Sequence, residues 1–309
     1  MQARTRFLVR AAVAAGSAYW LATCVGAAFL VNLALHPPHR PLDAGSASAL
    51  GVPVENVDLS AADGVTLRAW FAAPAQPNGA AVILLHGVAD NREGVAGYAR
   101  MFLARGYDVL LPDARAHGES GGAFATYGVL ERDDVRRWAA WLHPHAPGCE
   151  YLFGESMGAA IAIQASAVTP GICAIAVESS FATFREIASD RIAQISRLGL
   201  WFPHTLGAPA RELALAWVDI FDRVNLAEAS PLAAIRRSRV PTLLIAGTAD
   251  DNIPMRHSQE LERAGASHSQ LWIVDGAEHT GAMTADPRDF ERRVTSWFAT
   301  HDTPPGPVE

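Results

Sequence analysis

A single serine, Ser156, lies between two glycines in the motif GESMG. The motif follows the apolar run EYLFG, which we expect to be a strand, and precedes Met157–Val168, an alanine-rich stretch with helical spacing. Glycine is costly inside regular structure, so glycines near the serine on both sides indicate a turn too tight for side chains. A strand-to-helix turn of this kind lifts the hydroxyl out of the sheet. Ser156 is therefore a candidate nucleophile.

A serine hydroxyl is a weak nucleophile and needs a base, usually an imidazole that a carboxylate orients. His279 lies in the segment DGAEHTG, after the expected strand SQLWIV and before the last expected helix. In a doubly wound sheet, functional groups gather at the carboxyl ends of the strands, where this residue would lie. His86 and His117 also follow expected strands and remain possible. His279 is preferred because it comes last, as the chain order serine, aspartate, histidine requires.

The other histidines are not expected to take part in the chemistry. Those in helices or their flanking turns are expected to be solvated at the surface, namely His143, His145, His204, His257 and His268. The rest lie in the linker or the tail, namely His36, His39 and His301.

Two adjacent acids are candidates to orient the base. The segment AGTADDNIP follows the expected strand PTLLIAG and contains Asp250 and Asp251, of which only one can face the histidine. We expect Asp250 to be the catalytic acid. Asp251 is expected to be exposed, or to cap the helix that begins near Pro254.

Backbone N–H groups are the candidate oxyanion donors. The N–H of Met157, at the start of the expected helix, points to where an oxyanion would form next to the serine. The second donor is expected in the loop LLHGVADN, where Gly87 lets the backbone approach closely and the N–H of Val88 is our candidate. His86 is expected to shape this loop by hydrogen bonding.

Strands and helices alternate along most of the chain, which favours an α/β fold with a doubly wound, mostly parallel sheet. Val54–Leu59 and Val65–Ala72 alternate with period two around AADG and predict a hairpin. Residues 181–239 interrupt the alternation with helix-like segments rich in apolar residues.

The N-terminal 35 residues read as a membrane segment. Ala11–Leu35 is a run of 25 residues without charge, and about 20 are enough to span a bilayer. Three arginines precede the run, which favours a cytoplasmic N-terminus and a catalytic domain on the other side. We expect an uncleaved signal-anchor. A signal peptide cut near Ala28 and a lipoprotein site at Cys24 are the alternatives. Residues 36–53 read as a linker.

Charge and composition exclude several functions. Residues 1–40 contain four arginines and no acid, so the net charge of −7 for the chain becomes −11 for residues 41–309. Such an acidic domain has no electrostatic footprint for nucleic acid. The chain contains no lysine, which excludes Schiff-base and Ser–Lys chemistry.

The cysteines give no metal motif, and neither a metal nor an organic cofactor is implied. Cys24 lies inside the apolar run. We expect Cys149 and Cys173 to be buried free thiols, with a disulfide between them as the alternative if the domain is exported.

Five segments together resemble the α/β-hydrolase superfamily: LLHGVADN, LLPDARAHGESGG, GESMG, SPLAAIRRSRVPTLLIAGTADDNIP and GAEHTG. They are most similar to bacterial membrane-anchored hydrolases related to the serine aminopeptidase and prolyl-oligopeptidase-like groups. The resemblance covers residues 54–300. It implies that the catalytic domain spans residues 54–309 with a helical lid at about 181–239. It also implies that the first Asp of GTADDN, Asp250, is the catalytic acid.

The resemblance implies hydrolysis of esters, thioesters, amides or peptides and leaves the substrate open. Two features depart from the peptidase relatives: the chain has no N-terminal β-propeller, and it has no clear acidic pair for a free α-amine. Glu119, Glu155 and Glu178 are candidates for that pair, but structural hydrogen bonding is expected for each.

The apolar residues of the lid favour an acyl substrate. They either line an acyl pocket or pack the lid against the sheet: Trp201, Phe202, Leu206, Leu213, Trp217, Ile220 and Phe221. We therefore expect a membrane-anchored serine hydrolase that cleaves carboxylic esters. A serine peptidase with the same triad and a non-catalytic scaffold are the alternatives.

Overall fold

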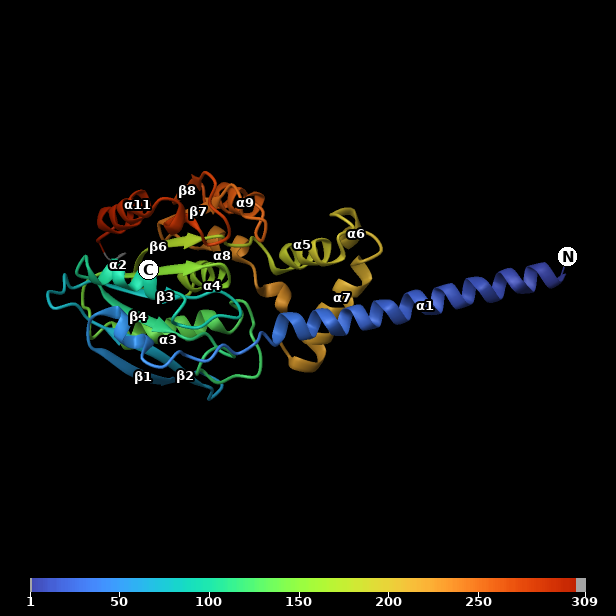
Figure 1. Cartoon of the computed structure of the whole chain (residues 1–309), viewed down its shortest axis with the longest axis horizontal. Coiled ribbons are helices and arrows are strands. Elements are labelled where there is room, and N and C mark those ends of the chain that lie inside the picture. The colour runs from blue at the N-terminus through green and yellow to red at the C-terminus, as the bar shows by residue number, and fades with distance from the viewer. Residues whose placement is uncertain (1, 304–309) are drawn as a thin grey trace.

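The computed structural model describes residues 2–303, and an eight-stranded sheet forms its centre (Figure 1). The order across the sheet is β1-β2-β4-β3-β5-β6-β7-β8, in which β1 and β2 pair antiparallel, as do β2 and β4, and the later neighbours pair in parallel. The strands are β1 (Val54–Ser60), β2 (Thr66–Ala72), β3 (Ala81–Leu85), β4 (Asp108–Pro112), β5 (Glu150–Glu155), β6 (Ile172–Glu178), β7 (Thr242–Gly247) and β8 (Ser269–Val274). The predicted α/β fold is confirmed. Residues 304–309 of the expected catalytic domain lie outside the described residues.

Helices cover both faces of the sheet because its central strands are apolar on both sides. In β3, Val82 and Leu84 face one buried cluster while Ile83 and Leu85 face the other. One face is covered by α2 (Ala96–Leu103) and α11 (Pro287–Thr300). The other face is covered by α3 (Glu131–Leu142), α4 (Met157–Ser166), α8 (Pro231–Arg237) and α9 (Arg256–Ala264).

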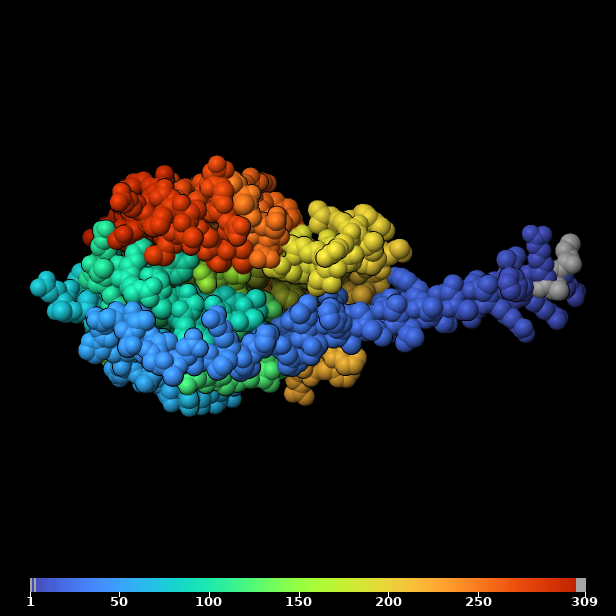
Figure 2. Space-filling view, in the orientation of Figure 1, coloured from blue at the N-terminus to red at the C-terminus, as the bar shows by residue number. Residues whose placement is uncertain are grey.

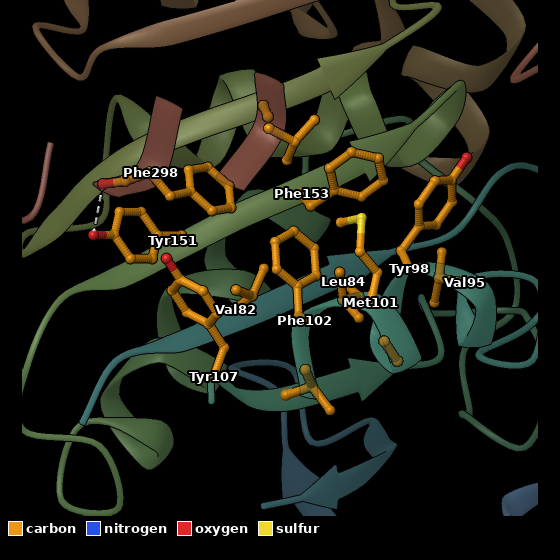
Figure 3. Close-up of a cluster of buried hydrophobic side chains, with 14 of the residues drawn as sticks. Val82, Leu84, Val95, Tyr98, Met101, Phe102, Tyr107, Tyr151, Phe153 and Phe298 are labelled. Carbon is orange, nitrogen blue, oxygen red and sulfur yellow. Dashed lines mark hydrogen bonds between the residues drawn. The ribbon is translucent and has the colours of Figure 1, made fainter. Parts of the chain in front are cut away.

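The core under α2 and α11 is rich in aromatic rings, as Figure 3 shows. The rings of Tyr151 and Phe298 stack with centroids 4.3 Å apart. The Tyr151 hydroxyl is satisfied in this apolar surrounding because it donates a 3.0 Å hydrogen bond to the carbonyl oxygen of Phe298. This contact fixes α11, and with it the C-terminal part of the chain, to the middle of the sheet.

A group of helices between β6 and α8 extends beyond the end of the sheet (Figure 1). It comprises α5 (Phe184–Ser196), α6 (Trp201–His204), α7 (Ala208–Trp217), a π-helical turn (Val218–Asp222) and a 3-10 turn (Leu226–Glu228). We call residues 184–228 the lid. A side-chain cap at Thr183, which accepts from the N–H of Glu186, starts α5.

The N-terminal helix α1 (Gln2–Leu35) is joined to both the lid and the domain built on the sheet. Arg4–Leu35 is long and apolar enough to be a candidate membrane span. Its C-terminal end is fixed, since Leu35 is fully buried and the Tyr127 hydroxyl donates to the carbonyl oxygen of Ala34. Its N-terminal half projects away from the rest of the molecule (Figure 1).

The segment that connects α1 to β1 runs along the catalytic domain and includes a 3-10 turn at Ser46–Leu50. Arg40 forms an ion pair of 2.9 Å with Asp90. The Asn91 side chain donates to the carbonyl oxygen of Arg40 at 3.1 Å. The segment is therefore attached to the loop after β3, which borders Ser156.

Cys149 and Cys173 form a disulfide, so the expectation of two free thiols is wrong. The two residues are separated by 24 positions in sequence, but they lie at the starts of β5 and β6, which are neighbours in the sheet. Their Cα atoms are 5.7 Å apart, a distance that a disulfide bridges without backbone movement. Strand adjacency, which sequence spacing does not report, brings the thiols together.

Candidate active site

Ser156 occupies a strained turn between β5 and α4. Its φ is 53° and its ψ is −115°, a conformation rare for residues with a side chain. Both flanking glycines are required by packing. A Cβ on Gly154 would stand 2.4 Å from the carbonyl oxygen of Gly158, and a Cβ on Gly158 would stand 2.1 Å from the carbonyl oxygen of Leu85. The turn can close only when both positions lack a side chain.

The structure brings together the three residues that the sequence singled out for catalysis. His279 Nε2 lies 2.9 Å from Ser156 Oγ, and His279 Nδ1 lies 2.9 Å from Asp250 Oδ2. They come from the ends of three elements: Ser156 follows β5, Asp250 follows β7 and His279 follows β8. With Nδ1–H donating to the carboxylate, Nε2 is free to accept the proton of the serine.

The Asp250 carboxylate is held in place by the backbone as well as by His279. Its Oδ1 accepts from the N–H groups of Asn252 at 2.9 Å and Ile253 at 2.8 Å. Burial acts to raise the pKa of Asp250, but the hydrogen bonds from His279 and from Ile253 outweigh it and lower the pKa below the ordinary value. Asp250 is therefore ionised beside the imidazole. Asp251 is exposed.

The loop after β3 borders the serine on the side where Val88 was expected to donate to an oxyanion. A Cβ on Gly87 would lie 3.5 Å from the Cβ of Ser156, so the glycine permits a close approach of the two segments. Val88, Ser156 and Met157 line the same cavity. Met157 is the first residue of α4, and its N–H lies at the positive end of that helix.

His86 and His117 each hydrogen-bond to a backbone carbonyl through Nδ1, and within residues 2–303 neither of them hydrogen-bonds to Ser156. His86 Nδ1 lies 2.7 Å from the carbonyl oxygen of Gly87, and its Nε2 accepts from the N–H of Ala114 at 3.0 Å. Burial lowers the pKa of His86, which keeps it neutral, as these two contacts require. Burial lowers the pKa of His117 to about 4. His86 shapes the loop, as predicted.

Two buried glutamates lie directly behind the serine. The Tyr98 hydroxyl lies 3.1 Å from Glu155 Oε2 and 3.4 Å from Glu178 Oε2. Burial, reinforced by the charge of Glu178, raises the pKa of Glu155 to about 8. Burial also raises the pKa of Glu178 to about 7. Both carboxyl groups make structural hydrogen bonds, as expected. Glu119 forms an ion pair with Arg92.

A largely apolar cavity of about 310 Å³ opens over Ser156. It lies in the lower part of the size range of ligand pockets. Its walls come from the loop after β3, from the lid and from α1. The α1 residues are Leu30, Val31, Leu33 and Ala34. The participation of α1 was not predicted, because nothing in an apolar run indicates which of its residues will meet a catalytic domain.

The apolar residues of the lid take neither place expected for them, at the cavity over Ser156 or against the sheet, and two of them, Phe202 and Leu206, instead line a second cavity between α1 and the lid. None of the seven lines the cavity over Ser156, and they do not pack against the sheet. Trp201, Leu206, Leu213, Trp217, Ile220 and Phe221 are exposed, and Phe202 is half-buried. The lid instead presents to the cavity another set of residues, namely Phe184, Ile187, Ala188, Arg191, Arg211, Ala214, Leu215, Val218 and Leu226.

His257 is buried, so its expected place at the surface is also wrong. Its Nε2 lies 2.8 Å from Asp190 Oδ2, and its Nδ1 accepts from the N–H of Ala182 at 3.2 Å. Because Asp190 belongs to α5 and His257 to α9, this pair holds the base of the lid against the catalytic domain. His257 is covered by α5, which belongs to the lid, and the sequence of α9 does not indicate that the lid packs there.

No group of three or more histidine, cysteine, aspartate or glutamate residues is arranged to hold a metal ion within residues 2–303.

Comparison with known proteins gives one family match and several relatives. A model described as the alpha/beta hydrolase family matches residues 82–293. YqkD of Bacillus subtilis, named as an uncharacterized protein, is 29% identical over 245 residues, which cover 78% of this chain and 77% of that protein. Rv2307c of Mycobacterium tuberculosis, also named as uncharacterized, is 28% identical over 247 residues, which cover 79% of this chain and 78% of that protein.

Solved structures share the fold. The esterase Pf2001 of Pyrococcus furiosus superposes with a TM-score of 0.72 at 23% identity, covering 87% of this chain and 99% of the esterase. A puromycin-hydrolyzing peptidase of Mycobacterium tuberculosis superposes with a TM-score of 0.62 at 20% identity, covering 84% of this chain and 41% of the peptidase.

Proposed function

Because the chain belongs to the α/β-hydrolase family, we propose that it is a serine hydrolase that cleaves carboxylic esters through Ser156, His279 and Asp250. The observation that carries the proposal is the position of His279, whose two ring nitrogens lie 2.9 Å from Ser156 Oγ and 2.9 Å from Asp250 Oδ2. This arrangement of nucleophile, base and orienting acid is the one that acyl transfer requires.

In the first half-reaction, Ser156 Oγ attacks the acyl carbon and its proton passes to His279 Nε2. The oxyanion accepts hydrogen bonds from the N–H groups of Met157 and Val88. Collapse of the tetrahedral intermediate breaks the bond to the leaving alcohol, which takes the proton from Nε2. In the second half-reaction, water attacks the acyl-enzyme and gives a proton to Nε2. Release of the acid returns that proton to Ser156. Asp250 stabilises the imidazolium in both halves.

The cavity supports an ester over the peptidase alternative. Its lining is largely apolar and contains Arg191 and Arg211 as its charged groups, with no carboxylate among the lining residues that the structure describes. An aminopeptidase needs an acidic group for the α-amine of its substrate. Glu155 and Glu178 do not serve this purpose, because both are buried behind the turn that carries Ser156 and hydrogen-bonded to Tyr98.

We propose further that α1 stays attached as a membrane anchor and that the catalytic domain lies outside the cytoplasm. The Tyr19 hydroxyl donates to the carbonyl oxygen of Leu206 in the lid at 3.1 Å, and Gly26 lies against Ala210. A cut near Ala28 would remove both contacts. The disulfide supports an oxidising compartment. An intact mass that lacks about the first 28 residues, measured on protein extracted from membranes, would contradict retention.

The test of the proposed reaction compares esters with anilides that carry the same acyl groups. We expect turnover of the esters and little turnover of the anilides, with Ser156→Ala as the inactive control. A fluorophosphonate should label Ser156 in the folded protein. The absence of both labelling and turnover would favour the non-catalytic scaffold, and anilide turnover of comparable efficiency would favour the peptidase.

A further inference from the structure

We propose that a groove between α1 and the lid is an entry route by which the acyl chain of a bilayer-resident ester reaches Ser156 from within the membrane. The proposal deepens the proposed ester hydrolysis and rests on it. The groove is a second cavity, of about 310 Å³, between one face of α1 and helices α5 to α7. We call it the α1–lid groove. In Figure 2 the blue α1 lies directly against the lid, which is coloured yellow to orange.

The groove lies next to the catalytic cavity along α1. Leu30 lines both spaces and therefore stands at the boundary between them. From Leu30 the groove follows α1 back to Tyr19, eleven residues earlier. At 1.5 Å per residue this is about 16 Å of helix. Helix α5 lies along both spaces as well, with Ile187 at the catalytic cavity and Ile195 at the groove.

The lining of the groove suits a hydrocarbon chain. On the α1 side it includes Ala22, Gly26 and Phe29, and on the lid side Ile192 and Ala210. The few polar groups are occupied within the protein. The Thr23 hydroxyl donates to the carbonyl oxygen of Tyr19 at 2.9 Å, and the Tyr19 hydroxyl donates to the lid. The surface therefore offers little to a polar ligand and much to an acyl chain.

The groove lies at the depth of the hydrocarbon layer when α1 spans the membrane. A span needs about 20 residues, and the uncharged run covers residues 11–35. Every stretch of 20 residues inside that run contains residues 16–30, and the α1 wall of the groove falls within this range. The open side of the groove therefore faces lipid, which makes a membrane-dissolved ester the substrate that can enter it.

The exposed surface of the lid fits the same placement. Trp201, Ile220 and Phe221 are 57%, 68% and 66% exposed, values unusual for such large apolar side chains in water. The charged residues at the middle of the lid pair with one another, since Glu212 binds both Arg185 and Arg211. A lid with large exposed apolar side chains and a paired charge cluster at its centre can rest against the bilayer beside α1, with exposed charged residues such as Arg197, Asp219 and Arg223 at the bilayer surface.

The test uses the full-length protein in phosphatidylcholine vesicles and two esters of one fluorogenic phenol, an acetyl ester in the aqueous phase and a palmitoyl ester dissolved in the bilayer. Gly26→Phe and Ala22→Phe place a ring in the groove. Val25→Phe is the matched control, because Val25 lies on α1, is 61% exposed and lines neither cavity. The measured quantity is the ratio of the two kcat/KM values, palmitoyl over acetyl.

We expect Gly26→Phe and Ala22→Phe to lower this ratio tenfold or more, and Val25→Phe to leave it within twofold of the wild type. A palmitoyl-over-acetyl ratio that stays unchanged in both groove variants, whether or not both activities fall, would overturn the entry route while leaving ester hydrolysis intact. Failure of the proposed function gives a different result: the wild type would then hydrolyse neither ester faster than Ser156→Ala.

Discussion

The backbone N–H of Ser156 donates a hydrogen bond of 2.9 Å to the carbonyl oxygen of Glu178. This contact joins the turn after β5 to the end of β6, so the position of the nucleophile depends on the pairing of these two strands. The Glu178 side chain continues the connection, because its Oε1 accepts from the N–H of Ala282 at 2.8 Å. Ala282 lies just past His279 in sequence. One glutamate thus holds both the serine turn and the segment that carries the base.

The raised pKa values of Glu155 and Glu178 predict a loss of stability as the pH rises from acidic to mildly alkaline values. A carboxyl group whose pKa is higher in the folded state contributes stability that is complete below the unfolded value and is lost as the pH rises through the folded value. Burial raises the pKa of the Glu155 carboxyl in the folded protein from the ordinary value of 4.5 to about 8. We therefore expect the free energy of unfolding to fall between about pH 5 and pH 8, by on the order of a few kcal/mol.

Glu155→Gln tests the predicted fall in the free energy of unfolding with rising pH, because the amide keeps the shape of the side chain and cannot ionise. The variant should lose less stability between pH 5 and pH 9 than the wild type when urea unfolding is followed at each pH. Glu55→Gln is the control, since Glu55 is exposed on β1 and should leave the pH dependence unchanged. Parallel pH curves for the wild type and Glu155→Gln would contradict the prediction.

The two adjacent aspartates should differ sharply in catalysis. Asp250→Asn keeps the size of the side chain but cannot hold Nδ1–H of His279, so the imidazole adopts the wrong tautomer. We expect kcat for an ester substrate to fall about 10⁴-fold. Asp251→Asn changes an exposed side chain and should stay within about twofold. Steady-state kinetics on both variants decide the point, and a larger loss in Asp251→Asn would show that the acid is wrongly assigned.

Ser156→Ala and His279→Ala should each remove nearly all turnover, on the order of 10⁴-fold or more. Because the two residues act as a unit, the double variant should be hardly worse than either single variant. Comparable melting temperatures for all three variants would show that catalysis, not folding, has been lost. Multiplicative losses in the double variant would mean that Ser156 and His279 act independently.

Gly158, the second glycine of the GESMG motif, should tolerate no side chain. Gly158→Ala would place a Cβ 2.1 Å from the carbonyl oxygen of Leu85, which is backbone and cannot rotate away. We expect a loss of about 3 kcal/mol or more in stability, at the upper end of overpacking costs. Gly97→Ala is the matched control, because its Cβ would lie in a helix with its nearest neighbour 4.0 Å away. It should be neutral or stabilising by up to about 1 kcal/mol.

The motif around Ser156 could be read from the sequence because its geometry is local. A tight strand-to-helix turn needs glycines at fixed positions, and the contacts of Gly154 and Gly158 explain both of them. The grouping of Asp250 and His279 with the serine also follows from chain order, since parallel strands of a doubly wound sheet end at the same edge. These features follow from the alternation of strands and helices along the chain and from the glycines at the turns.

The features that could not be read depend on which elements meet. His257 has polar neighbours in a short helix, and it is buried only because the lid packs over it and places Asp190 against it. Likewise, the pattern of Trp201 and Ile220 does not indicate whether their helix faces protein or turns outward. The outward orientation follows from the docking of the lid on α1, where a hydrogen bond joins two residues that are 187 positions apart in the sequence.

Removing the disulfide should lower stability without touching the active site. Cys149 and Cys173 join the starts of β5 and β6 across 24 residues, a loop whose closure contributes roughly 3 kcal/mol. The double variant Cys149→Ala/Cys173→Ala should therefore unfold at a lower urea concentration and keep its kcat, since Ser156 lies at the opposite end of β5. Cys24→Ala should change neither quantity, because Cys24 is exposed on α1 and unpaired by any disulfide. Identical unfolding curves for the double variant and the wild type would mean that the two thiols are not joined in the isolated protein.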